Sequence, residues 1–153
     1  MNPRKEYHAP MHTAEHILNQ TMVRKFGIER SFSNHIERKK SKCDYHFDRD
    51  ITIEEIADIE ERINQVIEMN LPVTEEFIDI NDARSKFNLI RLPKDAGDRI
   101  RIVRVGDYDA CPCSGNHVKN TREIGKFKII STSFNDNVLR ARFKLLDKED
   151  KKG

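Results

Sequence analysis

The 153-residue sequence has no tryptophan, only three cysteines and six glycines, and no long apolar run. A bilayer-spanning helix needs about 20 consecutive apolar residues, so we expect no membrane span. The residues before Pro10 lack the apolar stretch of a secretory signal, and three cysteines do not make a disulfide framework. We therefore expect a cytoplasmic protein whose reduced thiols serve a metal site or the core.

Charged residues make up 35% of the sequence but nearly cancel, with 28 basic and 26 acidic side chains and a net charge of +2. This balance excludes a protein whose whole surface is basic, so contacts with nucleic acid must come from local clusters. Two clusters of basic residues are candidates for phosphate contacts: Arg38, Lys39, Lys40 and Lys42, and Lys119, Arg122, Lys126 and Lys128.

Hydrophobic periodicity predicts an α+β protein. Apolar residues at helical spacing predict a helix over about residues 13–26 and a longer one after the capping box Thr52-Ile53-Glu54-Glu55. Further segments read as strands or as a short helix: strands at 31–36, 43–47, 73–80, 99–105, 127–134 and 138–145, and a helix at 81–87. We expect a single domain, residues 1–153, in which an antiparallel, curved sheet is packed by the long helix and by the histidine-bearing N-terminal helix.

Two pairs of metal-binding residue types lie far apart in the sequence. His12 and His16 are four residues apart, so on a helix they share one face. Cys113 and His117 are also four residues apart. Imidazole nitrogen and thiolate sulfur are typical zinc ligands, so the two pairs together predict one Zn²⁺ site. Cys111 is an alternative sulfur ligand; we prefer Cys113 because its spacing lets it reach the same ion as His117.

Two other functions are compatible with parts of this pattern. The segment from His12 to His16 also matches the His-x-x-Glu-His pattern of a class of zinc peptidases, with Glu15 as the general base, but that leaves Cys113 and His117 unexplained. Four protein ligands usually close a zinc site, so a non-catalytic RNA-binding module with structural zinc is another alternative. If the site is catalytic, we expect His117 to be the ligand that yields.

Three segments together resemble a known family: His12-Thr13-Ala14-Glu15-His16, Cys113-Ser114-Gly115-Asn116-His117-Val118 and Thr121-Arg122-Glu123-Ile124-Gly125. They are similar to the editing domain of alanyl-tRNA synthetases, and most of all to its free-standing short relatives, the AlaX proteins. These share the threonyl/alanyl-tRNA synthetase second additional domain. The resemblance covers nearly the whole chain.

The resemblance implies an ATP-independent, zinc-dependent hydrolase that deacylates mischarged tRNA in trans. The implied substrate is Ser-tRNA(Ala) or Gly-tRNA(Ala), with an editor of Ser-tRNA(Thr) as an alternative on the shared domain. The implied zinc ligands are His12, His16, Cys113 and His117. The tRNA acceptor end would be held by basic residues, of which the cluster after the metal motif is better placed.

The family also places a hydroxyl side chain on the wall of the amino-acid pocket near the first strand. Ser31 is the best match, and Ser33 is the alternative. The chain departs from the family between Cys113 and His117, where Gly-Gly-Thr is common and Ser-Gly-Asn stands here. Cys111 is a further departure. Both changes alter the rim of the expected pocket.

Overall fold

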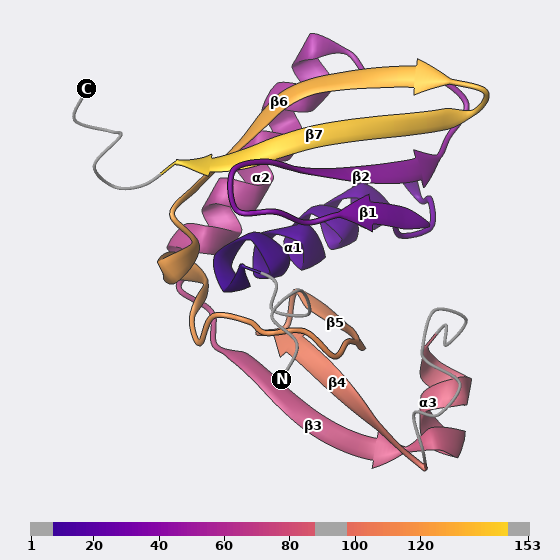
Figure 1. The fold of residues 1–153 in the computed structure, drawn as a ribbon, viewed down its shortest axis with the longest axis vertical. Coiled ribbons are helices and arrows are strands. Elements are labelled where there is room, and N and C mark those ends of the chain that lie inside the picture. The colour runs from indigo at the N-terminus through magenta and orange to yellow at the C-terminus, as the bar shows by residue number, and fades with distance from the viewer. Residues whose placement is uncertain (1–7, 88–97, 147–153) are drawn as a thin grey trace.

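The structure is a computed structural model that describes residues 8–87 and 98–146 (Figure 1). The elements in chain order are α1 (Ala9–Phe26), β1 (Ser33–His35), β2 (Ser41–His46), α2 (Ile53–Glu68), β3 (Val73–Asp79), α3 (Ile80–Lys86), β4 (Arg99–Val105), β5 (Asp109–Pro112), the 3₁₀ helix η2 (Thr121–Ile124), β6 (Lys126–Asn135) and β7 (Val138–Leu146). The expected α+β class is confirmed. Within the described ranges, no helix is long and apolar enough to cross a membrane.

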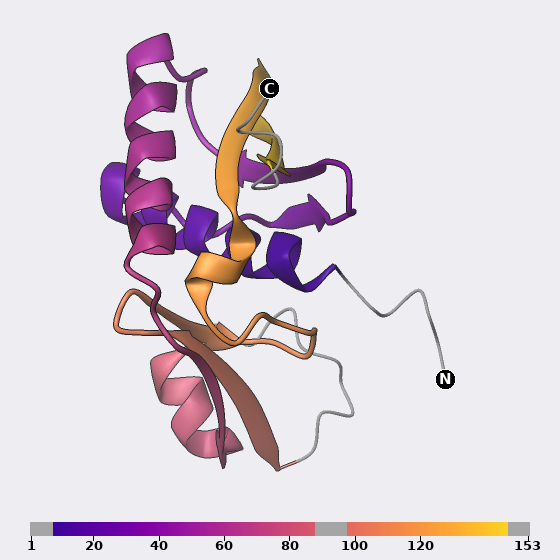
Figure 2. The same ribbon diagram turned by 90° about the vertical axis from the view of Figure 1, so that its left-hand side faces the viewer.

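The strands form two antiparallel sheets, where the sequence analysis expected one. One sheet has the order β1-β2-β7-β6 and the other the order β3-β4-β5. α1 lies between them: it packs with α2 beneath the four-stranded sheet and also contacts β5 (Figures 1 and 2). Every residue from Met11 to Asn19 is buried, including the polar ones. A helix enclosed on all sides in this way separates the strands into two layers.

α1 begins earlier than predicted, at Ala9 instead of near Thr13. Pro10 occupies its first turn, where the proline ring costs nothing because the first N–H groups of a helix have no intrahelical partner. The helix ends at Gly27, whose φ of 67° is the left-handed conformation that favours glycine. His12 therefore lies in the first turn, and His16 lies one turn further along than expected.

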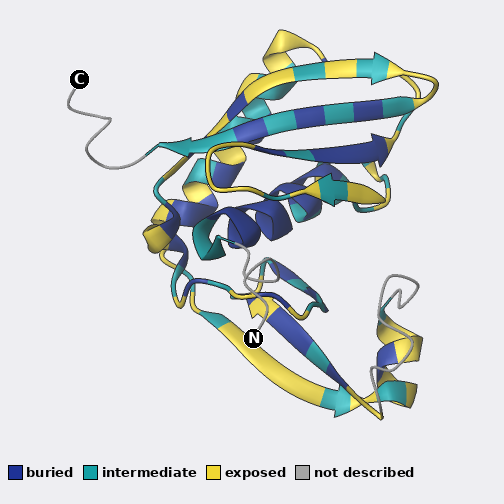
Figure 3. Cartoon of the chain, in the orientation of Figure 1, coloured by how far each residue is buried: buried dark blue, intermediate teal, exposed yellow. Residues whose placement is uncertain are grey.

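α2 follows the predicted pattern. The Thr52 side chain accepts a hydrogen bond from the Glu55 N–H (3.1 Å), and the Glu55 carboxylate accepts one from the Thr52 N–H (2.8 Å). This is the expected capping box. The buried stripe of the helix comprises Ile59, Ile63, Val66 and Ile67. Figure 3 shows the buried residues concentrated on α1 and the strands that face it, whereas β3 is largely exposed.

The segment from Thr121 to Gly125 lies between the metal loop and β6, and it packs against the end of α2. The Thr121 hydroxyl donates to the carbonyls of Val66 (3.1 Å) and Ile67 (3.0 Å) and accepts from the N–H of Leu71 (2.9 Å). At Gly125, φ is 89°, and an added Cβ would lie 2.8 Å from the Leu146 carbonyl oxygen. The motif therefore has a structural role: it fixes the loop that precedes it against α2.

Replacing Thr121 with valine keeps the shape of the side chain but leaves buried backbone groups of the α2 C-terminus without their partner. We expect the free energy of unfolding to fall by about 1–3 kcal/mol. Urea denaturation measures the loss, and Thr121→Ser, which keeps the hydroxyl, is the control. A larger loss in Thr121→Ser than in Thr121→Val would show that the methyl group and not the hydroxyl stabilises this junction.

Candidate metal centre

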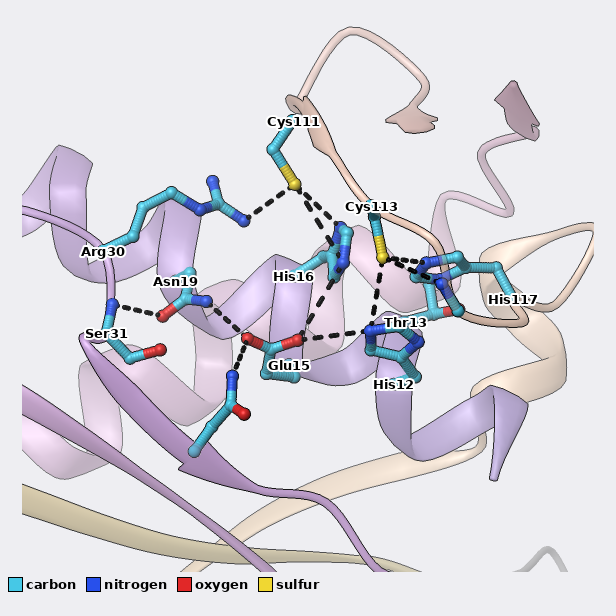
Figure 4. A network of polar contacts seen from close by, with 12 residues as sticks. His12, Thr13, Glu15, His16, Asn19, Arg30, Ser31, Cys111, Cys113 and His117 are labelled. Carbon is cyan, nitrogen blue, oxygen red and sulfur yellow. Dashed lines mark hydrogen bonds and ion pairs between the residues drawn. The ribbon is translucent and has the colours of Figure 1, made fainter. Parts of the chain in front are cut away.

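The four predicted metal ligands come together in the structure. His12 and His16 project from α1, while Cys113 and His117 come from the loop between β5 and η2. Their candidate ligand atoms all lie within 4.8 Å of one another. The Cys113 sulfur is 3.4 Å from Nε2 of His12 and 3.4 Å from Nε2 of His117. Figure 4 shows the three imidazoles gathered around this sulfur.

Hydrogen bonds on the far side of two imidazoles select the tautomer that a metal requires. Nδ1 of His12 lies 3.2 Å from the Asn116 carbonyl oxygen, which can only accept, so Nδ1 carries the proton. The Thr13 hydroxyl donates to the Ala9 carbonyl (3.1 Å), so it must accept from Nδ1 of His117 at 2.9 Å. In both rings, Nε2 is the nitrogen that faces the Cys113 sulfur, so it is the one available to a metal.

The third imidazole, His16, has acidic and sulfur groups on its outer side. Its Nδ1 is 3.2 Å from the Cys111 sulfur and 3.7 Å from Oδ2 of Asp109. Burial alone would lower the pKa of His16, but electrostatic interaction with Cys111 and the bond to Asp109 outweigh it and raise the pKa well above its usual value. Asp109 is itself fixed by Arg30, with 2.6 Å between Nη1 and Oδ1.

His16, Asp109 and Cys111 form a second group with metal-ligand chemistry, also within 4.8 Å. Arg30 occupies the place that a second cation would need, because its guanidinium lies 2.6 Å from Asp109 and 3.4 Å from the Cys111 sulfur. This group therefore orients the His16 imidazole and raises its pKa instead of forming another metal site. The choice of Cys113 over Cys111 as the ligand stays a prediction.

Cys113 and His117 are already in the protonation states that zinc binds, whereas His16 holds a proton that a bound ion would displace. Burial would raise the pKa of Cys113, but its contacts with the imidazoles of His117 and His12 lower it to about 3, so the sulfur is a thiolate at neutral pH. Burial and the neighbouring imidazoles lower the pKa of His117 to about 4, so that ring is neutral. Metals bind thiolates and neutral imidazoles, and zinc takes this donor set in a tetrahedron.

Glu15 lies beside the cluster, a position that the sequence analysis considered only for a peptidase. Its Oε2 accepts from the side-chain amides of Asn19 (2.8 Å) and Asn34 (2.9 Å). Its Oε1 is 3.8 Å from Nε2 of His12 and 3.9 Å from Nε2 of His16. The carboxylate is thus fixed by two amides and directed at the ligand face of two imidazoles.

The two candidate serines lie in different environments. Ser31 is buried, its hydroxyl lies beside the Cys43 thiol, and its N–H donates to the Asn19 side chain (3.1 Å). Through Asn19 it joins the network around Glu15, as Figure 4 shows. Ser33 is exposed at the start of β1, opposite Asp44, on the face of the sheet that points away from α1. Only Ser31 is therefore near the cluster.

The second basic cluster does not form one patch. Lys119 is exposed beside the metal loop, whereas Arg122 donates to the Glu68 carbonyl at the end of α2 (2.9 Å). Lys126 and Lys128 are exposed on β6. The residues of the first cluster lie in the β1–β2 turn and at the start of β2.

A cavity of about 300 Å³ lies next to the cluster. It is lined by residues of β3, β4 and the metal loop: Val73, Thr74, Glu75, Arg101, Val103, Asn116, His117, Val118 and Lys119. Arg101 stabilises the loop, since it donates to the carbonyls of Cys113 (2.8 Å) and Gly115 (3.0 Å). His117 therefore has one side in the cluster and the other at the cavity.

Thr13 should control metal affinity without touching the metal. Thr13→Val removes the acceptor that fixes the His117 tautomer, so we expect zinc affinity to fall by about 10–100-fold. Competition with a chromogenic chelator measures it, and Thr13→Ser, which keeps the hydroxyl, should bind zinc as the wild type does. Equal affinity of Thr13→Val and wild type would contradict the tautomer argument; melting of the metal-free proteins checks the fold.

Comparison with known proteins relates this chain to aminoacyl-tRNA synthetases. The model of the "Threonyl and Alanyl tRNA synthetase second additional domain" matches residues 100–153. The alanine–tRNA ligase of Fervidobacterium nodosum is 35% identical over 123 residues, which is 80% of this chain and 14% of the ligase. The alanine–tRNA ligase of Bacillus subtilis is 33% identical over 123 residues (80% and 14%), and that of Methanococcus vannielii is 34% identical over 138 residues (86% and 15%).

The chain spans about a seventh of the length of these curated relatives (14–15%), while they match most of the chain. The family model covers the metal loop, η2 and the closing strands β6 and β7. Residues 100–153 therefore match the second additional domain of threonyl and alanyl tRNA synthetases, and most of the chain is similar to a segment of alanine–tRNA ligases.

Proposed function

We propose that this chain is a zinc-dependent hydrolase that removes a wrongly attached amino acid from tRNA in trans. The proposed substrate is Ser-tRNA(Ala), with Gly-tRNA(Ala) as the second choice. The observation that carries the proposal is the cluster of one thiolate and three imidazoles at the edge of a cavity. The family supplies the RNA context, because the relatives are alanine–tRNA ligases.

His12, His16, Cys113 and His117 would hold the ion. A bound zinc ion would supply polarisation of the ester carbonyl, a lowered pKa for a water molecule, or orientation of the substrate. His12 and His16 are buried, whereas Cys113 and His117 are partly exposed, and His117 also lines the cavity. We assign His117 to the substrate side of the cluster and propose it as the ligand that yields.

Glu15 and Ser31 would recognise the amino acid. The two amides that hold Oε2 of Glu15 leave its other oxygen directed toward the cluster, where it can accept a hydrogen bond from the substrate's ammonium group. Ser31 lies further along the same buried network, where it would hydrogen-bond the hydroxyl group of the substrate's serine. Recognition of a hydroxyl can be strongly selective, because the analogue without it leaves buried polar groups unpaired.

The cavity beside His117 would hold the 3′-terminal nucleoside. Val73, Val103 and Val118 give it apolar walls, while Thr74 and Asn116 offer hydrogen-bonding groups. Lys119 stands at this cavity and is the best placed of the four predicted RNA contacts to meet a phosphate. We propose contacts further from the ester for Lys126 and Lys128, and assign Arg122 first to anchoring at the end of α2.

The first test is deacylation of Ser-tRNA(Ala), Ala-tRNA(Ala) and Ser-tRNA(Thr) by the zinc-loaded protein. We expect rapid hydrolysis of Ser-tRNA(Ala) and little of the other two. Cys113→Ala, which removes the thiolate ligand, should lower the rate at least about 100-fold, since ester hydrolysis depends on the metal. A folded, zinc-loaded protein that hydrolyses none of the three esters would contradict the proposal and favour a non-catalytic RNA-binding module.

The second test concerns selectivity. Ser31→Ala should lower the ratio of Ser-tRNA(Ala) to Ala-tRNA(Ala) hydrolysis by about tenfold or more, because the wall loses a partner for the substrate hydroxyl. Ser33→Ala is the matched control, since Ser33 points away from the site, and its ratio should equal that of the wild type. If both variants keep the wild-type ratio, Ser31 has no part in choosing the amino acid.

A further inference from the structure

The outward face of the four-stranded sheet carries a block of cations. Cys43, Leu139, Ala141 and Phe143 point into the core, so the residues that alternate with them point to solvent. The strand register sets Lys42 opposite Arg142 and Lys128 opposite Lys144. Lys126 lies two residues before Lys128 on β6, so both side chains point to the same face. We name the five the basic sheet face: Lys42, Lys126, Lys128, Arg142 and Lys144.

Like charges directly opposite each other on neighbouring strands destabilise a sheet, and here two such pairs lie side by side. In the described residues, no carboxylate lies within ion-pair distance of any of the five. Asp44 is the one acidic residue at an outward position of the four strands, and Arg140 already binds it with two hydrogen bonds of 2.8 and 3.0 Å. The positive charge of the face is therefore uncompensated within the described structure.

The positive charge is concentrated on this face and not spread over the whole surface, because the whole chain carries only +2. α2, on the other side of the same sheet, has exposed acidic residues that include Glu54, Glu61 and Glu68. A polyanion would thus be attracted to one side of the sheet and repelled from the other. The arrangement gives an approaching RNA a preferred orientation.

The residue types of the face indicate which part of an RNA it fits. Single-stranded RNA is usually bound by stacking bases on aromatic side chains, whereas helical stems are contacted through their phosphates. The outward positions of β2, β6 and β7 carry no Phe, Tyr or Trp, but they carry lysines, arginines and serines. The Arg142 guanidinium donates to the hydroxyls of Ser131 (3.2 Å) and Ser133 (3.4 Å).

We propose that the basic sheet face binds the phosphate backbone of a helical stem of the tRNA, away from its 3′-terminal nucleotides. The proposal rests on the proposed function for the identity of the RNA. It places most of the binding energy on the four-stranded sheet, while the ester is handled between α1 and the metal loop. The like-charge pairs are tolerated because the phosphates neutralise them in the complex.

The experiment measures binding of deacylated tRNA(Ala) by fluorescence anisotropy at 50 to 200 mM salt. Arg142→Gln/Lys144→Gln removes one cation from each opposing pair. Loss of two phosphate contacts should lower the salt slope by about 1.8, so the wild type should lose about tenfold more affinity than the variant over this range. Arg84→Gln/Lys86→Gln removes two exposed cations from α3 instead and should keep the wild-type slope.

Thermal unfolding without RNA provides the second measurement. The Arg142→Gln/Lys144→Gln variant should be at least as stable as the wild type at low salt, because removing like charges relieves repulsion across the sheet. A wild-type salt slope, or a slope equally reduced in the α3 control, would overturn the proposal. Binding requires no hydrolysis, so a protein that cleaves no ester but shows the expected slopes would refute the proposed function and leave the basic sheet face intact.

Discussion

The structure depends on one constraint: residues 11–19 of α1 are all buried although four of them are strongly polar. His12, Glu15, His16 and Asn19 are all at most 6% exposed. Buried polar groups are costly unless they are hydrogen-bonded, and the strands and loops around these four residues supply their partners. β1 provides Asn34, β2 provides Tyr45 and β5 provides Asp109, while the metal loop provides the thiolate of Cys113 and the Asn116 carbonyl. The four-stranded sheet is thus held to α1 by polar contacts in addition to the apolar core that they share.

The same contacts prepare the site for chemistry. A histidine becomes a good ligand when its outer nitrogen is fixed by a hydrogen bond, and each imidazole here has such an outer partner. Asp109 illustrates how far the arrangement extends: it lies near Nδ1 of His16 and also accepts from Gln20 (2.8 Å) and Arg30 (2.6 Å). Burial would raise the pKa of Asp109, but the hydrogen bond with His16 and the positive charge of Arg30 outweigh it and keep the pKa low, so the carboxylate stays ionised. Stability and ligand geometry therefore rest on the same bonds.

The sequence predicted what local patterns encode. The capping box at Thr52 correctly predicted the start of α2, and the histidine pair correctly predicted a shared face on α1. A cap and a helical face are both set by residues within one or two turns. The sequence did not reveal Arg30 or the second sheet, since these depend on which segments pack around α1. Asp109 left a usable signal: it lies two residues before Cys111, so on a strand it points to the same side. Thr13 and Glu15 stood inside the motif, but their roles required the loop across from them.

Charges in the interior are matched by opposite charges or hydrogen-bond donors, whereas the cations of the basic sheet face are not. In the interior, charges such as those of Asp109 and Glu15 are matched by fixed donors, which is how a protein keeps charged groups buried. On the basic sheet face, cations are placed against cations although hydroxyl or acidic residues would fit the same exposed positions. Sheet stability gains nothing from that choice. A surface that costs stability is expected where it binds a partner, and a partner that neutralises a row of cations must itself carry regularly spaced negative charge.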